Sequence, residues 1–343
     1  MCEMCAYVGR TRAAAPVLLE YGKRVEGIWS GFATGIGVQD SEGKLSVRKT
    51  LGYSRYWEEQ YRTDELPGTV GFFHSRTGYH GMPGDRRYAH PFLALDGSSA
   101  AVSQGAIGIF AGKSGRIAET GNLLLDHGIR FSSADLLETE RFQLLKDGTR
   151  VHMSDIVNGF AAFLVGQGLS PLEAVRRVGS EIQEESVTFF LFRKYPGRLY
   201  GINMNQRMCL SCHADGISLA NCALAFGDER VEVMTLPCNC VFEITPDSVR
   251  IEKLSEEFKV YPNVPAGMED AFLEWVGEHP HTQLACLMDN VLKLRYPDGV
   301  LRHVPVHEIF EQLYYDGKLR LDRVEYPGVG EEKSIRFEIS RNQ

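Results

Sequence analysis

No stretch of this sequence reaches the roughly 18 consecutive apolar residues that a membrane-spanning helix requires. Its first residues lack a basic segment followed by an apolar one, so no secretory signal is expected. Positive charge is also in deficit, because the formal net charge is −8 over 343 residues, and this argues against nucleic acid as a partner. The sequence therefore predicts a soluble, cytoplasmic globular protein with no membrane contact and no cofactor.

Disulfides are not expected among the eight cysteines, because cytosolic proteins rarely form them. Two pairs have the spacing of metal or haem ligands: Cys2 with Cys5, and Cys209 with Cys212, which precedes His213. The four thiols could form a zinc site, and the second pair matches the attachment sequence of a c-type haem. The favoured interpretation is that most are small buried residues on strands, and we predict no metal ligand.

The order of the predicted elements is typical of an α+β protein in which helices cover sheets. Apolar spacing predicts a first helix over 13–26 and another over about 153–165. Ser170, Pro171 and Glu173 supply the N-cap, first-turn proline and N3 acid of a helix that ends near 183. Strands are predicted at 31–38, 44–50, 68–75, 98–103, 187–192, 198–203, 216–220, 231–235, 239–244 and 248–252.

Residues 256–267, which end in a segment rich in proline and glycine, are predicted to link a domain over 1–255 to a small C-terminal α/β module over 268–343. The predicted elements of this module have the order of a winged helix: helices at 268–278, 282–294 and 305–316, then a hairpin of 318–323 with 334–339. Residues 262–343 hold nine basic and fourteen acidic side chains, and DNA binding depends on phosphate neutralisation. A protein contact or a homo-oligomer interface is therefore the favoured role.

Cys2 is the most informative residue, because removal of Met1 would make it N-terminal. It would then carry a thiol nucleophile and, in its own α-amine, a base with an unperturbed pKa of about 7.7–8.0. Such a nucleophile also needs groups that hold its substrate and donors that stabilise an oxyanion.

Two later segments could supply these groups. Arg76 follows an apolar strand and enters a loop with Tyr79 and His80, where a fixed guanidinium could clamp a small carboxylate. Gln104 and Gly105 follow a strand of small residues, where a side-chain amide and a backbone N–H could converge on an oxyanion.

Taken in order, these segments resemble the class II glutamine amidotransferases, which are N-terminal-nucleophile hydrolases. The resemblance is closest to the glutaminase domain of glucosamine-6-phosphate synthase. The matching segments are residues 1–2, 6–9, 16–20, 34–38, 44–49, 68–71, 74–76, 80–81, 89–91 and 101–105. The similarity continues thinly to about residue 252, whereas residues 253–343 do not resemble the sugar-isomerase half of that synthase.

The resemblance implies a four-layer αββα fold and hydrolysis of glutamine to glutamate and ammonia through a thioester on Cys2. It implies that Arg76 and its neighbouring loop, with Tyr79 and His80, hold the glutamine, and that Gln104 and Gly105 stabilise the oxyanion. Glu138 falls near the position of the aspartate that binds the substrate α-amine in the family. Because no synthase domain is recognised, we expect a separate synthase partner to receive the ammonia.

Several residues depart from the family pattern. Glu3 replaces a glycine, where a carboxylate would repel a thiolate, and Gln104 replaces the oxyanion asparagine. Thr77 replaces a tryptophan, Tyr79 replaces a threonine, and residues 29–33 lose the polar pair of the family. Two alternatives therefore stay open: an enzyme that hydrolyses another small amide, and an inactive regulatory or binding protein on the same scaffold.

Overall fold

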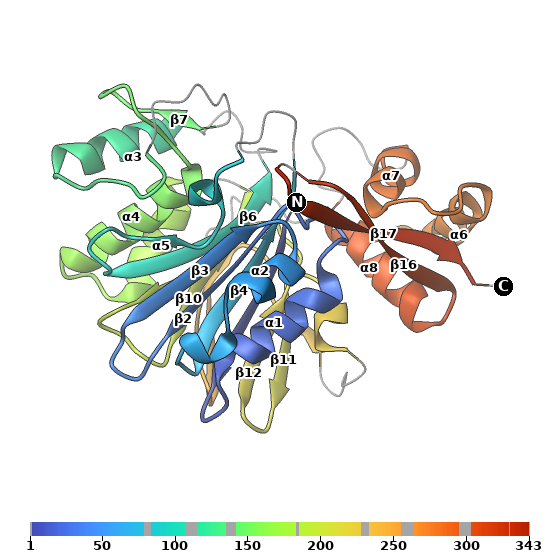
Figure 1. The fold of residues 1–343 in the computed structure, drawn as a ribbon, viewed down its shortest axis with the longest axis horizontal. Helices are drawn as coiled ribbons and strands as arrows, with labels where there is room; N and C mark the ends of the chain where they lie inside the picture. The colour runs from blue at the N-terminus through green and yellow to red at the C-terminus, as the bar shows by residue number, and fades with distance from the viewer. Residues whose placement is uncertain are drawn as a thin grey trace.

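The computed structural model describes residues 2–78, 84–106, 115–134, 142–182, 185–227, 233–254, 264–294, 303–328 and 330–342. In these residues two antiparallel sheets lie face to face, and helices pack on their outer faces (Figure 1). The predicted mixture of helices and sheets is confirmed. No helix in this part of the chain has the length and apolar character needed to cross a bilayer.

The first sheet has seven strands in the order β13-β11-β12-β1-β4-β2-β3. The strands are β1 (Glu3–Gly9), β2 (Ala33–Gln39), β3 (Leu45–Leu51), β4 (Val70–Arg76), β11 (Cys209–His213), β12 (Gly216–Ala220) and β13 (Val233–Thr235). The start of the chain is therefore the central strand. Met4 pairs with His74 on one side, and Cys5 pairs with Ala220 on the other.

The second sheet has six strands in the order β15-β14-β10-β9-β6-β5. They are β5 (Phe92–Leu93), β6 (Ser99–Ala106), β9 (Glu185–Phe192), β10 (Leu199–Asn203), β14 (Cys240–Thr245) and β15 (Ser248–Lys253). Side chains alternate between the two faces of a strand, so Val102 and Phe189 pack between the sheets. Ala101 and Phe190 face outward toward helices. A two-stranded ribbon of β7 (Gln143–Leu144) and β8 (Arg150–Val151) lies apart from both sheets.

In the described residues before 255, the structure has five α-helices. The helices α1 (Ala14–Val25) and α2 (Ser54–Gln60) pack on the seven-stranded sheet. The others, α3 (Gly115–Asp126), α4 (Met153–Gly166) and α5 (Pro171–Glu181), form an apolar cluster with the outer face of the six-stranded sheet. The predicted capping box of α5 is present, because Ser170 accepts from the Glu173 backbone and Glu173 accepts from the Ser170 backbone.

The C-terminal residues form the predicted helices and hairpin. They are α6 (Met268–Glu278), α7 (Leu284–Leu287) with a π-helical turn (Met288–Leu292), α8 (His303–Tyr315), β16 (Leu319–Pro327) and β17 (Lys333–Arg341). These elements lie beside the sheets, on the side away from α4 and α5 (Figure 1). They share one apolar cluster with α1 and β4, which includes Phe272, Phe310 and Phe337 together with Leu18 and Phe73. Of the predicted linker 256–267, only residues 264–267 are described.

The close approach of Gly35 to the loop before β5 generates a test of this packing. A Cβ at Gly35 would lie 2.0 Å from the His90 carbonyl oxygen, whereas a Cβ at Gly277, in α6, would meet open space. We expect Gly35→Ala to lower the free energy of unfolding by more than about 2 kcal/mol, because backbone must shift to remove the overlap. Gly277→Ala is the matched control and should be neutral or slightly stabilising. Denaturant unfolding measures both.

Candidate active site

Cys2 lies where the central strand begins, and strand alternation sets the direction of its side chain. Met4 and Ala6 face the space between the sheets, whereas Cys5 and Tyr7 face the outer cluster with α1. Cys2 is two residues before Met4 and therefore belongs to the inner side. Its side chain is half-buried at the edge of the intersheet space.

The surroundings of the Cys2 thiol act on its pKa in both directions. Burial raises the pKa, because it disfavours the charged thiolate. A hydrogen bond from the Thr77 backbone and the positive charge of Arg76 lower it. The sequence-predicted Arg76 is thus brought beside the sequence-predicted nucleophile.

Arg76 ends β4 and is only 5% exposed. One of its guanidinium nitrogens donates a hydrogen bond to the Tyr88 carbonyl oxygen. The carbonyl belongs to the loop that leads to β5, so this contact ties the loop to the end of β4. At least one donor of the predicted carboxylate clamp is therefore engaged within the protein.

Glu3 acts on the Cys2 thiol in the predicted direction, because its charge raises the Cys2 pKa, but this effect is small. Its side chain lies on the outer side of β1, where Oε1 accepts a 3.0 Å hydrogen bond from the Trp29 backbone N–H. Burial raises the pKa of Glu3 to about 8, so the carboxyl is mostly neutral at pH 7. Repulsion of a Cys2 thiolate is accordingly the smallest of the effects on the Cys2 pKa.

Asn221, which sequence reasoning assigned no role, holds the start of β1 in place. Its side-chain Nδ2 donates to the Cys2 carbonyl oxygen at 3.2 Å, and its Oδ1 accepts from the Met4 N–H at 3.0 Å. The Asn221 side chain is fully buried. The sequence shows only an asparagine directly after the predicted strand 216–220, and its contacts with Cys2 and Met4 join segments more than 200 residues apart.

Gln104 and Gly105 lie on β6, on the sheet that faces β1 and β4. Gln104 is 2% exposed and shares the inner face with Val102, whereas Gly105 is exposed. The two sheets are connected at this level, because His74 Nε2 lies 3.1 Å from the Ser103 carbonyl oxygen and donates to it. Cys2, Arg76 and Gln104 thus belong to one end of the intersheet space.

Three histidines line the same region, the buried His74 and His90 and the half-buried His152, and sequence reasoning missed their grouping. The ring centroids of His74 and His90 are 4.0 Å apart, and those of His90 and His152 are 5.0 Å apart. Burial lowers the pKa of His74 to about 3 and the pKa values of the other two well below their ordinary range. The positive charge of Arg76 acts in the same direction, so all three imidazoles are neutral at pH 7.

Three predicted substrate-binding residues, Tyr79, His80 and Glu138, lie outside the described residues, and their roles stay predictions. The four-thiolate zinc site is contradicted. Cys209 and Cys212 are three residues apart on strand β11, so they face opposite sides, one buried and one exposed. In the described part of the chain, the cluster with suitable geometry for a metal is a different one, Cys222 with His307 and Glu311.

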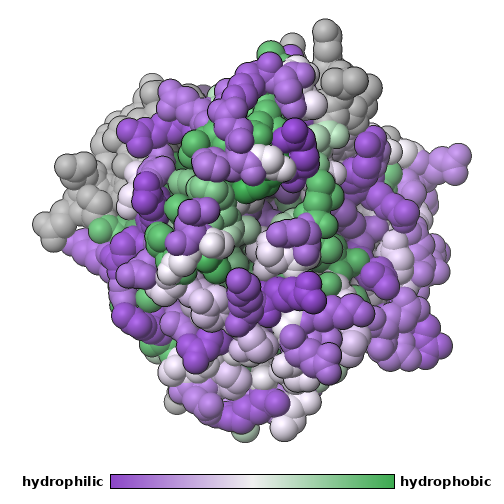
Figure 2. Space-filling view, turned by 90° about the vertical axis from the view of Figure 1, so that its left-hand side faces the viewer, coloured by the Kyte–Doolittle hydropathy of each residue, from purple (hydrophilic) through white to green (hydrophobic). Residues whose placement is uncertain are grey.

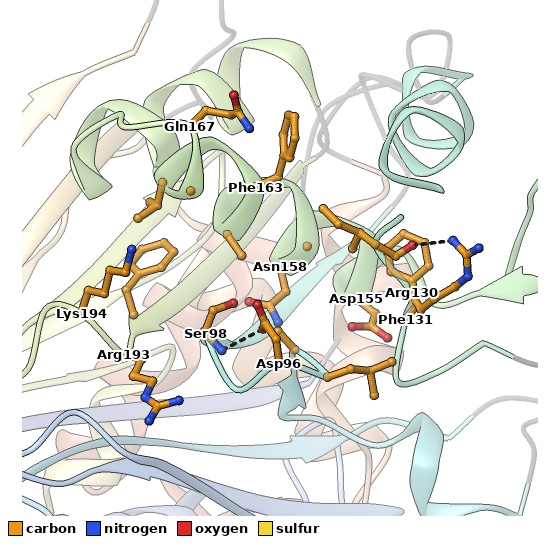
Figure 3. A pocket seen from close by; sticks show the side chains of 18 of the residues that line it. Asp96, Ser98, Arg130, Phe131, Asp155, Asn158, Phe163, Gln167, Arg193 and Lys194 are labelled. Carbon is orange, nitrogen blue, oxygen red and sulfur yellow. Dashed lines mark hydrogen bonds between the residues drawn. The ribbon is translucent and has the colours of Figure 1, made fainter. Parts of the chain in front are cut away.

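A cavity of about 990 Å³ lies elsewhere, on the outer side of the six-stranded sheet. Figure 2 shows apolar side chains lining a hollow on the face that carries α3 to α5. In Figure 3, Phe131, Phe163 and Asn158 surround the cavity, and Asp155 lies deep within it. Asp155 Oδ2 accepts from the Ser132 hydroxyl and from the backbone and hydroxyl of Ser133, so this oxygen is satisfied within the protein. The six-stranded sheet separates this cavity from Cys2.

No family model matches the chain. Among curated proteins, the isomerizing glutamine–fructose-6-phosphate aminotransferase of Gluconobacter oxydans is 25% identical over 256 residues, which cover 73% of this chain and 36% of that protein. Proteins of the same name from Methanothermobacter thermautotrophicus and Mycobacterium bovis are 33% and 37% identical over 107 and 115 residues. Those matches cover 31% and 32% of this chain and 18% of each relative. The chain thus spans about a third of the length of the first relative and less of the others.

Two solved structures share the fold. The glutamine phosphoribosylpyrophosphate amidotransferase of B. subtilis aligns with a TM-score of 0.59 and 9% identity, covering 96% of this chain and 68% of that one. An allosteric regulatory enzyme of purine biosynthesis aligns with a TM-score of 0.58 and 10% identity, covering 99% and 71%. Both alignments extend over nearly the whole chain, so the chain shares its fold with these two structures. The resemblance to the class II glutamine amidotransferases, which the sequence indicates, is confirmed.

The buried neutral histidines predict a pH dependence of stability. In the unfolded chain each imidazole would bind a proton below about pH 6.5. In the folded protein it binds a proton only at a lower pH, which for His74 is about pH 3. The unfolded state therefore binds more protons in this range, so stability is complete above pH 6.5 and falls as pH decreases. The free energy of unfolding should change by up to about 1.4 kcal/mol per pH unit for each histidine.

Denaturant unfolding of His90→Phe between pH 7 and pH 4.5 checks this expectation. The comparison with wild type removes the contribution of other titrating groups, and the slope should be shallower in the variant. Leu294→Ala, which changes an exposed side chain that has no titrating group, should keep the wild-type slope. An unchanged slope in His90→Phe would show that His90 is protonated in the folded state.

Proposed function

We propose that this protein is a glutamine amidotransferase that hydrolyses glutamine to glutamate and ammonia and passes the ammonia to a separate synthase partner. The observation that carries the proposal is the position of Cys2. It lies at the open end of a strand bonded on both sides, beside the Arg76 guanidinium and the Thr77 backbone, with Gln104 on the facing sheet.

The chemistry requires removal of Met1. The freed α-amine would take the proton of the Cys2 thiol, and the thiolate would attack the side-chain amide carbon of glutamine. Gln104 and the Gly105 backbone N–H would stabilise the negative charge on the amide oxygen. The C–N bond then breaks, the amine returns its proton to the leaving ammonia, and water hydrolyses the thioester to glutamate. Neutral histidines nearby leave the thiolate and the α-amine as the charged reacting groups.

The finer features of the architecture are part of the same proposal. The two sheets with helices on both outer faces correspond to the four-layer αββα sandwich of this hydrolase class. Residues 1–255 would form that domain, and residues 268–343 would form a C-terminal module that resembles a winged helix. The acidic character of this module supports a protein contact, either with the synthase partner or with a second copy of the chain.

A different small amide is the second candidate substrate, and one observation favours it. The Arg76 guanidinium already donates to the Tyr88 carbonyl oxygen, which leaves fewer donors for a substrate carboxylate. Gln104 is almost fully buried, and its extra methylene places its amide further from the β6 backbone than an asparagine amide would lie. Both features suit a substrate that differs from glutamine at its carboxylate end or its amide.

Substitution of the nucleophile gives a direct test. We expect the wild type to release ammonia from glutamine and Cys2→Ala to lose this activity by at least about a thousandfold, because no other group forms the thioester. Cys286→Ser removes an exposed thiol and should leave the activity unchanged. Ammonia is measured by a coupled dehydrogenase assay, and intact mass establishes whether Met1 is absent. Equal ammonia release by wild type and Cys2→Ala would reject the mechanism.

Covalent labelling separates the two substrates. An electrophilic glutamine analogue should label Cys2 of the wild type, and free glutamine should slow the labelling. Gln104→Asn should raise kcat/KM for glutamine if the longer side chain misplaces the amide donor. Labelling by iodoacetamide but not by the glutamine analogue would favour another amide. Retention of Met1 would favour the interpretation that the chain is an inactive regulatory or binding protein.

A further inference from the structure

Helix α8 of the C-terminal module contacts both of the segments that hold the start of β1. Its residues His307 and Glu311 are one helical turn apart and therefore share a face. Both are buried, at 1% and 4% exposure. Their contacts run in two separate directions toward Cys2, although Cys2 and α8 are about 300 residues apart in the sequence.

The first connection runs through Trp29. The Trp29 indole N–H donates a 2.8 Å hydrogen bond to His307 Nε2, and the Trp29 backbone N–H donates to Glu3 Oε1 at 3.0 Å. Glu3 is joined to Cys2 by a peptide bond. A single tryptophan thus bridges α8 and the residue after the nucleophile. Hairpin β16–β17 packs on the same loop, where the Phe337 N–H donates to the Gly27 carbonyl oxygen at 2.7 Å.

The second connection runs through the segment after β12. Glu311 Oε1 accepts from the Ala223 N–H at 3.1 Å, and its Oε2 accepts from Arg207 at 2.9 Å. Ala223 is two residues from Asn221, whose side chain bonds to the Cys2 carbonyl oxygen and the Met4 N–H. Glu311 therefore holds the segment 221–223 in place, and Asn221 in this segment holds the backbone of Cys2.

We propose that α8 is the element that positions the nucleophile, with His307 and Glu311 as positioning residues for Cys2. The proposal rests on the proposed function for its catalytic consequence, but not for its effect on the reactivity of the thiol. A nucleophile depends on its placement, since a displacement of about 1 Å can cost about a hundredfold in rate. Loss of either connection would let Cys2 move away from the Thr77 backbone and Arg76, which favour its thiolate.

The same residues could be taken for a metal site, because ligand atoms of Cys222, His307 and Glu311 lie within 4.8 Å of one another. Their hydrogen bonds argue against it. His307 Nε2 accepts from Trp29, both oxygens of Glu311 accept from other donors, and one donor is the Arg207 cation. Burial also raises the pKa of Cys222 well above its ordinary value, which disfavours the thiolate that a metal needs.

Paired substitutions at His307 test the first connection. His307→Leu has similar volume but no acceptor for the indole, whereas the side-chain oxygen of His307→Gln can accept. Gln312→Ala, on the exposed side of α8, is the matched control. The rate of iodoacetamide alkylation of Cys2, followed by peptide mass spectrometry, should fall about tenfold in His307→Leu. It should recover to within about threefold of wild type in His307→Gln and stay unchanged in Gln312→Ala.

The exposed thiols of Cys212 and Cys286 serve as internal references and should react equally in all variants. With glutamine, His307→Leu should lower kcat about tenfold and leave KM within about twofold, because substrate contacts are retained. Trp29→Phe removes the same hydrogen bond, so the double variant should show no further loss beyond either single variant. This coupling also protects the test against a general loss of folding, which would be additive.

Three outcomes would overturn the proposal: wild-type alkylation of Cys2 in folded His307→Leu, additive losses in the double variant, or stoichiometric zinc bound at His307. Failure of the proposed function gives a different pattern. In that case the wild type releases no ammonia, yet the alkylation rates of Cys2 still differ among the His307 variants as expected.

Discussion

The pairing of β1 in the middle of the seven-stranded sheet is the constraint on which the rest of the candidate site depends. A strand bonded to β4 and β12 on its two edges cannot shift along or away from either neighbour without breaking both ladders. The chain start, which is usually mobile, is thereby fixed up to the residue that follows Cys2. Asn221 extends the order by one more residue, because its side chain takes the place of a neighbouring strand.

The end of β4 is fixed by an equally specific set of contacts on the opposite face. Glu26 is completely buried and accepts hydrogen bonds from the Thr34 hydroxyl, the Ser75 hydroxyl and the Ser54 N–H. A buried carboxylate is costly unless such donors surround it. Ser75 immediately precedes Arg76, so the network on the outer face determines where the guanidinium lies on the inner face. The outer face of β4 thus carries the hydrogen bonds that hold the end of the strand, and its inner face carries the candidate site residue Arg76.

Several of the elements that sequence reasoning predicted carry a one-sided pattern or a local signal. Helix α1 has an apolar stripe, α5 has a capping box, and the hairpin β16–β17 is exposed on one face. Strand β1 is buried on both faces and lacks polar alternation. Sequence reasoning did not predict it, although it did predict β2 and β4, which are equally buried. In β11, the C-x-x-C-H spacing suggested ligands, although on a strand that spacing separates the two thiols. The role of Asn221 and the grouping of His74 with His90 depend on contacts between distant segments, which no local pattern contains.

In the sequence, the carboxylate of Glu3 conflicts with a nucleophilic role for Cys2. In the structure, the same carboxylate helps to hold the start of β1 against Trp29. In the fold, alternation along β1 directs the Glu3 side chain to the outer face. Burial raises its pKa to about 8, so the carboxyl is mostly protonated at neutral pH. A glycine at this position would remove the carboxylate that accepts from the Trp29 backbone N–H, and a typical intramolecular hydrogen bond stabilises a fold by about 0.5–1.5 kcal/mol. The substitution of glycine by glutamate is therefore understandable in a chain whose C-terminal module packs against Trp29.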